Sequence, residues 1–264
     1  MSVAKAAAAG AAALALAAGG YGVSTLFSGG MPDYEPLTKS TGKYVSEYQD
    51  YFVSADKNEP WWEWVYKSRY LVNGEKDVEG DARPTPKTAF ASLDRGSGNT
   101  DKDIQKVCKD FYEAENSKVK TGTVASGEYE EEDAWRYCTA IKKKPKTINE
   151  NSGEENSYGE TTSTDTYGKA KKENLISITS TDNALFWKEQ NRLFFKDKGN
   201  RSGSKFKKDN TSSIFRDLWH TRKGDIKGAC EAAYKLSSGN SAQSSPTANQ
   251  NDIFKFCSLR GTAS

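Results

Sequence analysis

Apolar residues recur at helical spacing in two separate stretches of the chain. They are Ile104, Val107, Cys108, Phe111 and Tyr112 in the first stretch, and Ile226, Ala229, Cys230, Ala233 and Tyr234 in the second. Positions i, i+3, i+4, i+7 and i+8 lie on one face of an α-helix. Both stretches therefore predict an amphipathic helix that carries one cysteine on its buried face.

The blocks on either side of these helices also recur, and in the same order. A W-x-x-x-x-R motif precedes each helix, at residues 64–69 and 187–192, so that Arg69 matches Arg192. A block that ends in an aromatic residue and a cysteine follows each helix, at residues 133–138 and 252–257. Colinear matches of this kind indicate an internal duplication. We therefore predict a mainly α protein of two tandem, diverged modules with about three helices each.

The polar stretches of the chain divide it further. The predicted order is a leader at 1–30, an extended spacer at 31–57, helical repeat 1 at 58–141, a flexible polar linker at 142–174 and helical repeat 2 at 175–264. The stretch 142–174 is dominated by Lys, Asn, Ser, Gly, Glu and Thr. Such a composition buries too little apolar surface to offset the entropy of ordering. At most a minor sheet is expected, with 175–179 as its only candidate strand.

The amino-terminal segment decides the expected compartment. Residues 6–32 carry no charged side chain, and a helix over residues 6–27 would span about 33 Å, enough to cross a bilayer. Three interpretations remain open: a retained signal-anchor, a signal peptide cleaved near residues 15–17, and a soluble Ala-rich helix or disordered leader. We favour the anchor. Lys5 then places the amino end inside and the bulk of the chain outside the cell membrane, with secretion as the alternative.

Four cysteines and a single histidine limit the chemistry that the chain can perform. The cysteines are even in number and form no C-x-x-C pair, so neither a metal site nor a metal cofactor is expected. If the two copies fold alike, each closes its own disulfide, Cys108 with Cys138 and Cys230 with Cys257. The alternative is that all four are reduced core residues.

Catalytic and nucleic-acid signals are missing from the sequence. The 38 basic and 36 acidic residues nearly cancel to +2, which excludes a strongly basic nucleic-acid coat. No G-x-S-x-G, H-E-x-x-H or phosphate-binding glycine loop occurs. An S-x-x-K match at residues 54–57 lacks companion motifs. We therefore predict neither an enzyme nor a cofactor, and nothing in the sequence predicts an oligomeric state.

Two features remain as candidates for contact with a partner. One is the basic stretch 192–208, whose cations are Arg192, Lys196, Lys198, Arg201, Lys205, Lys207 and Lys208. With phenylalanines interleaved, it could bind polyanions, or it could be an ordinary solvated loop. The other is the cluster of Trp61, Trp62 and Trp64. At least two of these should pack in a core, and Trp62 is the one that could contact a partner.

The leader, the W-x-x-x-x-R block, the cysteine helix and endings such as Tyr137-Cys138-Thr139 resemble the large paralogous families of hypothetical proteins in haemotropic mycoplasmas. The resemblance covers the leader and both copies, although family members more often correspond to one copy. It implies a wall-less bacterium, membrane attachment, surface exposure, and a role in antigenic variation or contact with a host protein. No functional residues are known for these families, so none carry over.

Overall fold

The computed structural model describes residues 30–38, 44–72, 76–98, 100–159, 165–209, 211–239 and 246–263. The fold is mainly helical, as predicted. Its helices are α1 (Glu59–Val65), α2 (Ile104–Tyr112), α3 (Glu131–Cys138), α4 (Tyr167–Ala170), α5 (Ala184–Phe194), α6 (Ile214–Thr221), α7 (Ile226–Tyr234) and α8 (Gln250–Cys257). A π-helical turn, Tyr66–Tyr70, continues α1. The strands β1 (Val119–Lys120) and β2 (Tyr129–Glu130) pair in parallel.

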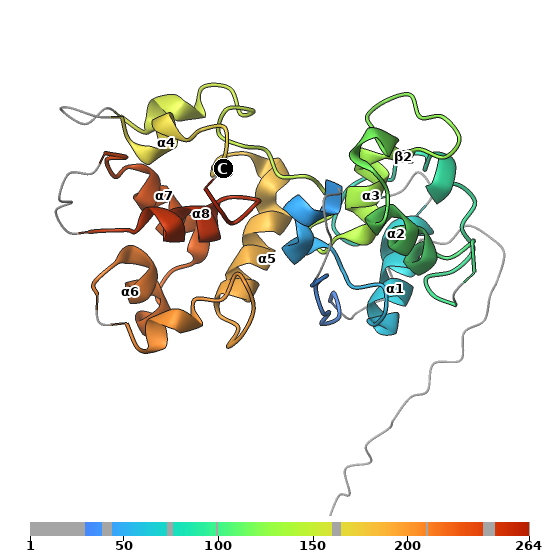
Figure 1. Cartoon of the computed structure of the whole chain (residues 1–264), viewed down its shortest axis with the longest axis horizontal. Helices are drawn as coiled ribbons and strands as arrows, with labels where there is room; N and C mark the ends of the chain where they lie inside the picture. The colour runs from blue at the N-terminus through green and yellow to red at the C-terminus, as the bar shows by residue number, and fades with distance from the viewer. Residues whose placement is uncertain are drawn as a thin grey trace, which may run out of the picture.

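The helices gather into two groups that share one core. Helices α1 to α3 lie at one end of the molecule and α4, α6, α7 and α8 at the other, with α5 between them beside the segment 44–53 (Figure 1). For clarity, residues 30–142 are called the N-terminal half and residues 143–263 the C-terminal half. Buried apolar residues of both halves form one continuous cluster. Tyr51 joins the halves, because its ring lies 5.4 Å from that of Phe186 and its hydroxyl donates to Gln190 at 2.7 Å.

The two cysteine-bearing helices begin in the same way. The side chain of Asp103 accepts a hydrogen bond from the Lys106 amide at the start of α2, and Asp225 accepts from the Gly228 amide at the start of α7. These carboxylates satisfy amides that a helix leaves unpaired in its first turn. The predicted apolar stripes are buried in both helices.

Tyrosines at the ends of these helices make matched contacts in the two halves. Tyr112 donates to the carbonyls of Val53 and Cys138, and Tyr234 donates to those of Ile176 and Cys257. Short antiparallel bridges are matched as well, with Pro36 against Val53 and Thr147 against Ile176. Val53 and Ile176 therefore occupy matched positions in the two halves, and so do Pro36 of the expected spacer and Thr147 of the expected linker.

The stretch 142–174 differs from the expected polar linker in the part that the structure describes. Ile148, Tyr158 and Tyr167 are buried in the core. The carboxylate of Glu154 accepts hydrogen bonds from the Ile178 amide at 2.7 Å and the Tyr158 hydroxyl at 2.7 Å. These residues pack into the core although the segment is mostly polar, because a few well-placed aromatic and aliphatic residues and one buried acid tie it to the rest of the fold.

The tryptophan cluster is buried in full, so the expectation that Trp62 could reach a partner is wrong. Trp61 and Trp62 are completely buried, and Trp64 is nearly so. A loop covers the far side of α1. A Cβ placed on Gly96 would lie 2.4 Å from the Trp62 carbonyl oxygen, so only glycine allows this close approach. The indole nitrogen of Trp62 donates to the Lys57 carbonyl at 2.9 Å.

The leader, with its expected membrane helix at residues 6–27, lies outside the described residues. From residue 30 onward, no described helix has the length and the apolar content that a membrane crossing requires.

Candidate functional site

Each half contains one buried arginine that closes the carboxyl end of its last helix. Arg69 donates to the carbonyls of Arg136, Thr139 and Ala140 at the end of α3. Arg201 donates to the carbonyls of Lys255, Ser258 and Leu259 at the end of α8. A helix leaves its last carbonyls unpaired and carries partial negative charge there, so a guanidinium satisfies both requirements.

The W-x-x-x-x-R motif matched Arg69 with Arg192, but the structure gives Arg69 a different counterpart in the C-terminal half. Arg192 pairs with Glu189 at 2.7 Å and with Asp33 at 2.8 Å, and its guanidinium lies 5.0 Å from the centre of the Tyr34 ring. The structural counterpart of Arg69 is Arg201, which comes from the loop after α5. Sequence reasoning missed it because the arginine reaches the helix end from a different place in the chain.

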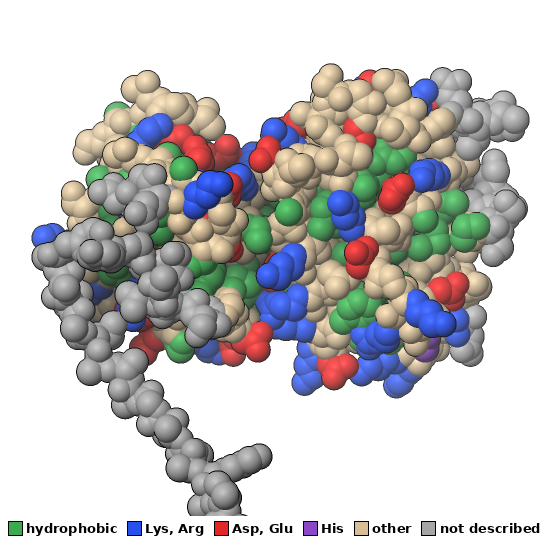
Figure 2. Space-filling view, turned by 180° about the vertical axis from the view of Figure 1, so that it is seen from behind, with side chains coloured by type: hydrophobic (Ala, Val, Ile, Leu, Met, Phe, Trp, Pro, Cys, Tyr) green, Lys and Arg blue, Asp and Glu red, His purple; other side chains and the backbone are tan. Residues whose placement is uncertain are grey.

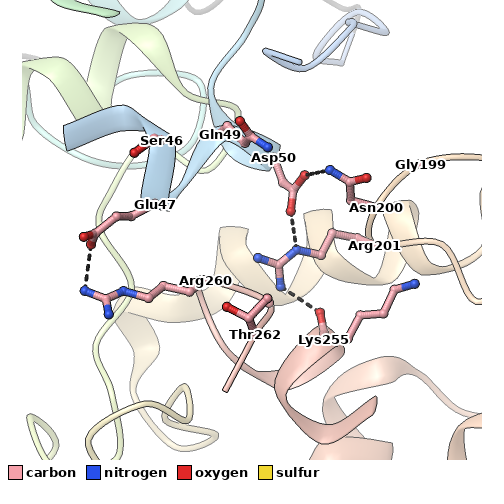
Figure 3. Close-up of a pocket in the computed structure, with 11 residues that line it drawn as sticks. Ser46, Glu47, Gln49, Asp50, Gly199, Asn200, Arg201, Lys255, Arg260 and Thr262 are labelled. Atoms are coloured by element: carbon pink, nitrogen blue, oxygen red, sulfur yellow. Dashed lines mark hydrogen bonds and ion pairs between the residues drawn. The ribbon is translucent and has the colours of Figure 1, made fainter. Parts of the chain in front are cut away.

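The two arginines differ in their counter-ions. Arg69 pairs with Glu79, a residue of its own half, at 2.8 Å. Arg201 pairs at 2.7 Å with Asp50, which belongs to the N-terminal half. A second pair, Glu47 with Arg260 at 2.7 Å, crosses between the halves beside it. Figure 3 shows both pairs joining the segment 46–50 to the C-terminal half.

The two ion pairs border a cavity of about 650 Å³ between the halves. Its wall includes Asp50, Asn200, Arg201, Lys255 and Arg260. Asn200 donates to the second oxygen of Asp50 at 2.9 Å, which fixes that carboxylate. The size is within the range of small-molecule sites. The side chains suit a polar ligand, because no large apolar side chain is among the residues that border this cavity.

Lys255 is the cation of this cavity that has no ion pair within the described part of the chain. It is half-buried. Burial lowers the pKa of its ammonium, and the positive charge of Lys205 lowers it further. Arg201 and Arg260 each pair with a carboxylate, whereas Lys255 makes no ion pair of its own and feels the negative charges of Asp252 and Asp50 only at longer range. The cavity can therefore accept an anionic group.

The basic stretch 192–208 is largely neutralised. Five of its seven cations pair with acids: Arg192 and Lys196 with Asp33, Arg201 with Asp50, Lys205 with Asp252 and Lys207 with Asp197. Lys198 and Lys208 are exposed and have no ion pair within the described residues. Figure 2 shows Lys and Arg side chains gathered at the lower edge of the molecule, with acidic side chains among them. The stretch does not form the unbroken positive surface that polyanion binding favours.

The four cysteines are paired as the duplication predicts. Cys108 bonds Cys138 with a sulfur–sulfur distance of 1.97 Å, and Cys230 bonds Cys257 at 2.01 Å. Each bond ties the middle helix of a half to its last helix. In the described residues, no group of His, Cys, Asp and Glu is arranged to hold a metal ion. The imidazole of His220 contacts the Phe206 carbonyl at 2.8 Å on the surface.

Comparison with known proteins gives no match, since no family model, no curated protein and no solved structure is similar to the chain.

Proposed function

We propose that this chain is a non-enzymatic binding protein of the cell surface, held in the membrane by residues 6–27 with its bulk outside. The observation that carries the proposal is the pair of disulfides, one in each half. Disulfides of this kind persist in oxidising compartments and are rare in the cytosol. The leader and the resemblance to surface-associated families favour the same location.

We also propose that the binding unit consists of two copies of one helical module. Matched disulfides, matched tyrosine contacts and matched arginines at the helix ends support the duplication. The copies then meet at the cavity beside Arg201, which is where we place the contact with a ligand. The ammonium of Lys255, which has no ion pair among the described residues, favours an anionic group, such as an acidic side chain of a host or surface protein.

Labelling of intact cells tests the surface location. A membrane-impermeant amine reagent should modify the exposed Lys198 and Lys208, and peptide mapping should locate the label. Lys142 is fully buried, so it is the internal control and should stay unlabelled before and after lysis. Modification of Lys198 and Lys208 only after lysis would refute surface display.

Mapping the same material without reductant tests the compartment separately. The expected peptides link Cys108 to Cys138 and Cys230 to Cys257. Free thiols in the native protein would contradict an oxidising environment, even if the surface lysines are labelled.

The alternative function, polyanion binding by the stretch 192–208, makes a different prediction. Lys198 and Lys208 are the cations of the stretch that remain available, so their charge reversal should abolish retention on heparin if the alternative is correct. On our proposal, the Lys198→Glu and Lys208→Glu variants elute at the same salt concentration as the parent. Charge reversal of Lys255 should instead weaken the capture of an acidic partner.

A further inference from the structure

Lys142 occupies a position where the backbone favours glycine. Its φ is +65°, and the matched residue of the C-terminal half is Gly261 with φ +77°. The match is set by hydrogen bonds, since the Lys142 amide donates to the Thr139 hydroxyl and the Gly261 amide donates to the Ser258 hydroxyl, each at 3.0 Å. A side chain at such a φ is strained. The lysine must therefore supply something that glycine cannot.

The Lys142 side chain is fully buried against three carboxylates. Its ammonium nitrogen, Nζ, lies 2.5 Å from Oδ2 of Asp77, 2.9 Å from Oδ2 of Asp81 and 3.5 Å from Oε2 of Glu79. The Asp77 side chain is also fully buried. These three contacts are ion pairs, and the ammonium has the Asp77 carboxylate as its nearest neighbour among them. The amine is therefore held within reach of the Asp77 carboxyl group.

The other oxygen of Asp77 is held by the backbone. Oδ1 accepts hydrogen bonds from the amides of Glu79 and Asp81, both at 3.0 Å. Two amides aimed at one carboxyl oxygen stabilise negative charge that develops on it when a nucleophile attacks the carbon. The Asp77 carboxyl group thus has an amine on one side and an oxyanion-binding pair on the other.

We propose that Lys142 and Asp77 condense into an intramolecular amide. Nζ attacks Cγ of Asp77, and Oδ1 takes up the negative charge against the two amides. Glu79, a carboxylate 3.5 Å from Nζ, carries one proton from the ammonium to Oδ2 before the attack and a second from the nitrogen to the same oxygen after it, so that Oδ2 leaves as water. An ammonium and a carboxylate give one amide and one water, so atoms and charge balance, and no oxidant or cofactor is consumed.

Condensation also resolves an electrostatic problem in the core. A buried ion pair carries a desolvation penalty that its mutual attraction need not recover, whereas an amide is neutral. Arg136, which lies 3.5 Å from Oδ2 of Asp77, loses that contact when the oxygen leaves but keeps Glu132 at 3.7 Å, and Arg69 keeps Glu79 at 2.8 Å. The new bond would join the chain after α3 to the loop after α1, beside the disulfide of the same half.

Mass spectrometry of the full chain tests the proposal directly. The reduced wild-type protein should be lighter than its sequence by one water, and a protease digest should contain one branched peptide that joins the segments around residues 77 and 142. An unmodified mass together with two linear peptides would overturn the proposal.

Two variants test whether the lost water comes from the bond between Lys142 and Asp77. Lys142→Arg keeps a cation but cannot form this amide, so it should be heavier than the wild type by one water beyond the lysine-to-arginine difference. Glu79→Gln removes the proton carrier and should leave most molecules uncondensed. A wild type and a Lys142→Arg variant that both lack one water would place the loss elsewhere and refute the assignment. If either variant fails to fold, the branched peptide of the wild type decides alone.

Discussion

Replacing Arg201 with methionine should uncouple the two halves of the protein. The methionine keeps much of the apolar stem but removes the donors that reach three carbonyls at the end of α8. It also leaves Asp50, whose side chain is only 16% exposed, without its cation. The substitution therefore breaks a helix end and an inter-half contact in one step.

The magnitude follows from the burial of this pair. Removing one partner of a buried ion pair costs about 3–5 kcal/mol, because the other charge remains buried and unpaired. We expect Arg201→Met to lower the free energy of unfolding by about 4 kcal/mol. Asp50→Asn, which keeps an oxygen to accept from Arg201, should cost about 2 kcal/mol. The double variant should cost less than the sum by about 2 kcal/mol, which is the coupling energy of the pair.

Urea unfolding followed by tryptophan fluorescence measures these values. Each half contains at least two of the six tryptophans, so the fluorescence change reports on the unfolding of both halves. The matched control is Arg260→Met, because the Glu47–Arg260 pair borders the same cavity but both side chains are more than 40% exposed. An exposed pair contributes at most about 1 kcal/mol. Additive effects of Arg201→Met and Asp50→Asn, or an equally large effect of Arg260→Met, would refute the reasoning.

Four further predictions concern stability. Replacing both Cys230 and Cys257 with serine should lower the free energy of unfolding by about 3–4 kcal/mol for a loop of 27 residues, measured by urea titration, and an unchanged midpoint would contradict this. Burial, with the negative charges of neighbouring glutamates, raises the pKa of Asp133 from 3.8 to about 6. The folded chain therefore binds more protons between these values and loses stability as the pH rises through them. The free energy of unfolding of the wild type should fall by about 2–3 kcal/mol between pH 4 and 7 on account of Asp133, and the Asp133→Asn variant should lack this fall. Parallel pH profiles of the two proteins would argue against this assignment. Gly96→Ala should destabilise the fold by about 2 kcal/mol or more, since its Cβ would collide with a backbone carbonyl of α1. Gly228→Ala, inside α7, should instead stabilise the fold by about 0.5–1 kcal/mol, and thermal melts that rank the two glycine variants in the opposite order would refute the packing argument.

Local patterns predicted much of the helical fold. The apolar stripe around Cys108 and the one around Cys230 each predicted a helix, and the order of the repeats predicted which cysteines pair. These features depend on residues close in sequence, so periodicity and spacing are enough to find them. The burial of all three tryptophans was only partly predicted, because one helix face cannot hold them all and the covering loop at Gly96 is distant in sequence.

Long-range contacts account for what the sequence did not reveal. Asp50 lies in a segment expected to be a spacer, and nothing in its neighbourhood indicates that it pairs with Arg201. Lys142 stands first in a run of three lysines, which is typical of a solvated loop, yet it is the buried one. Both residues acquire their roles from segments more than 60 positions away, a distance that no local pattern spans.

The ion pair between Arg201 and Asp50, which crosses between the halves, bears on how this gene can evolve. Glu79 serves the arginine of its own copy, whereas Arg201 borrows its acid from the other copy. If the halves arose by duplication, this shared ion pair makes the change hard to reverse. Deleting or replacing either copy would leave Arg201 or Asp50 without its partner. The C-terminal copy could regain independence only by first acquiring an acid of its own, so the pair should be inherited together.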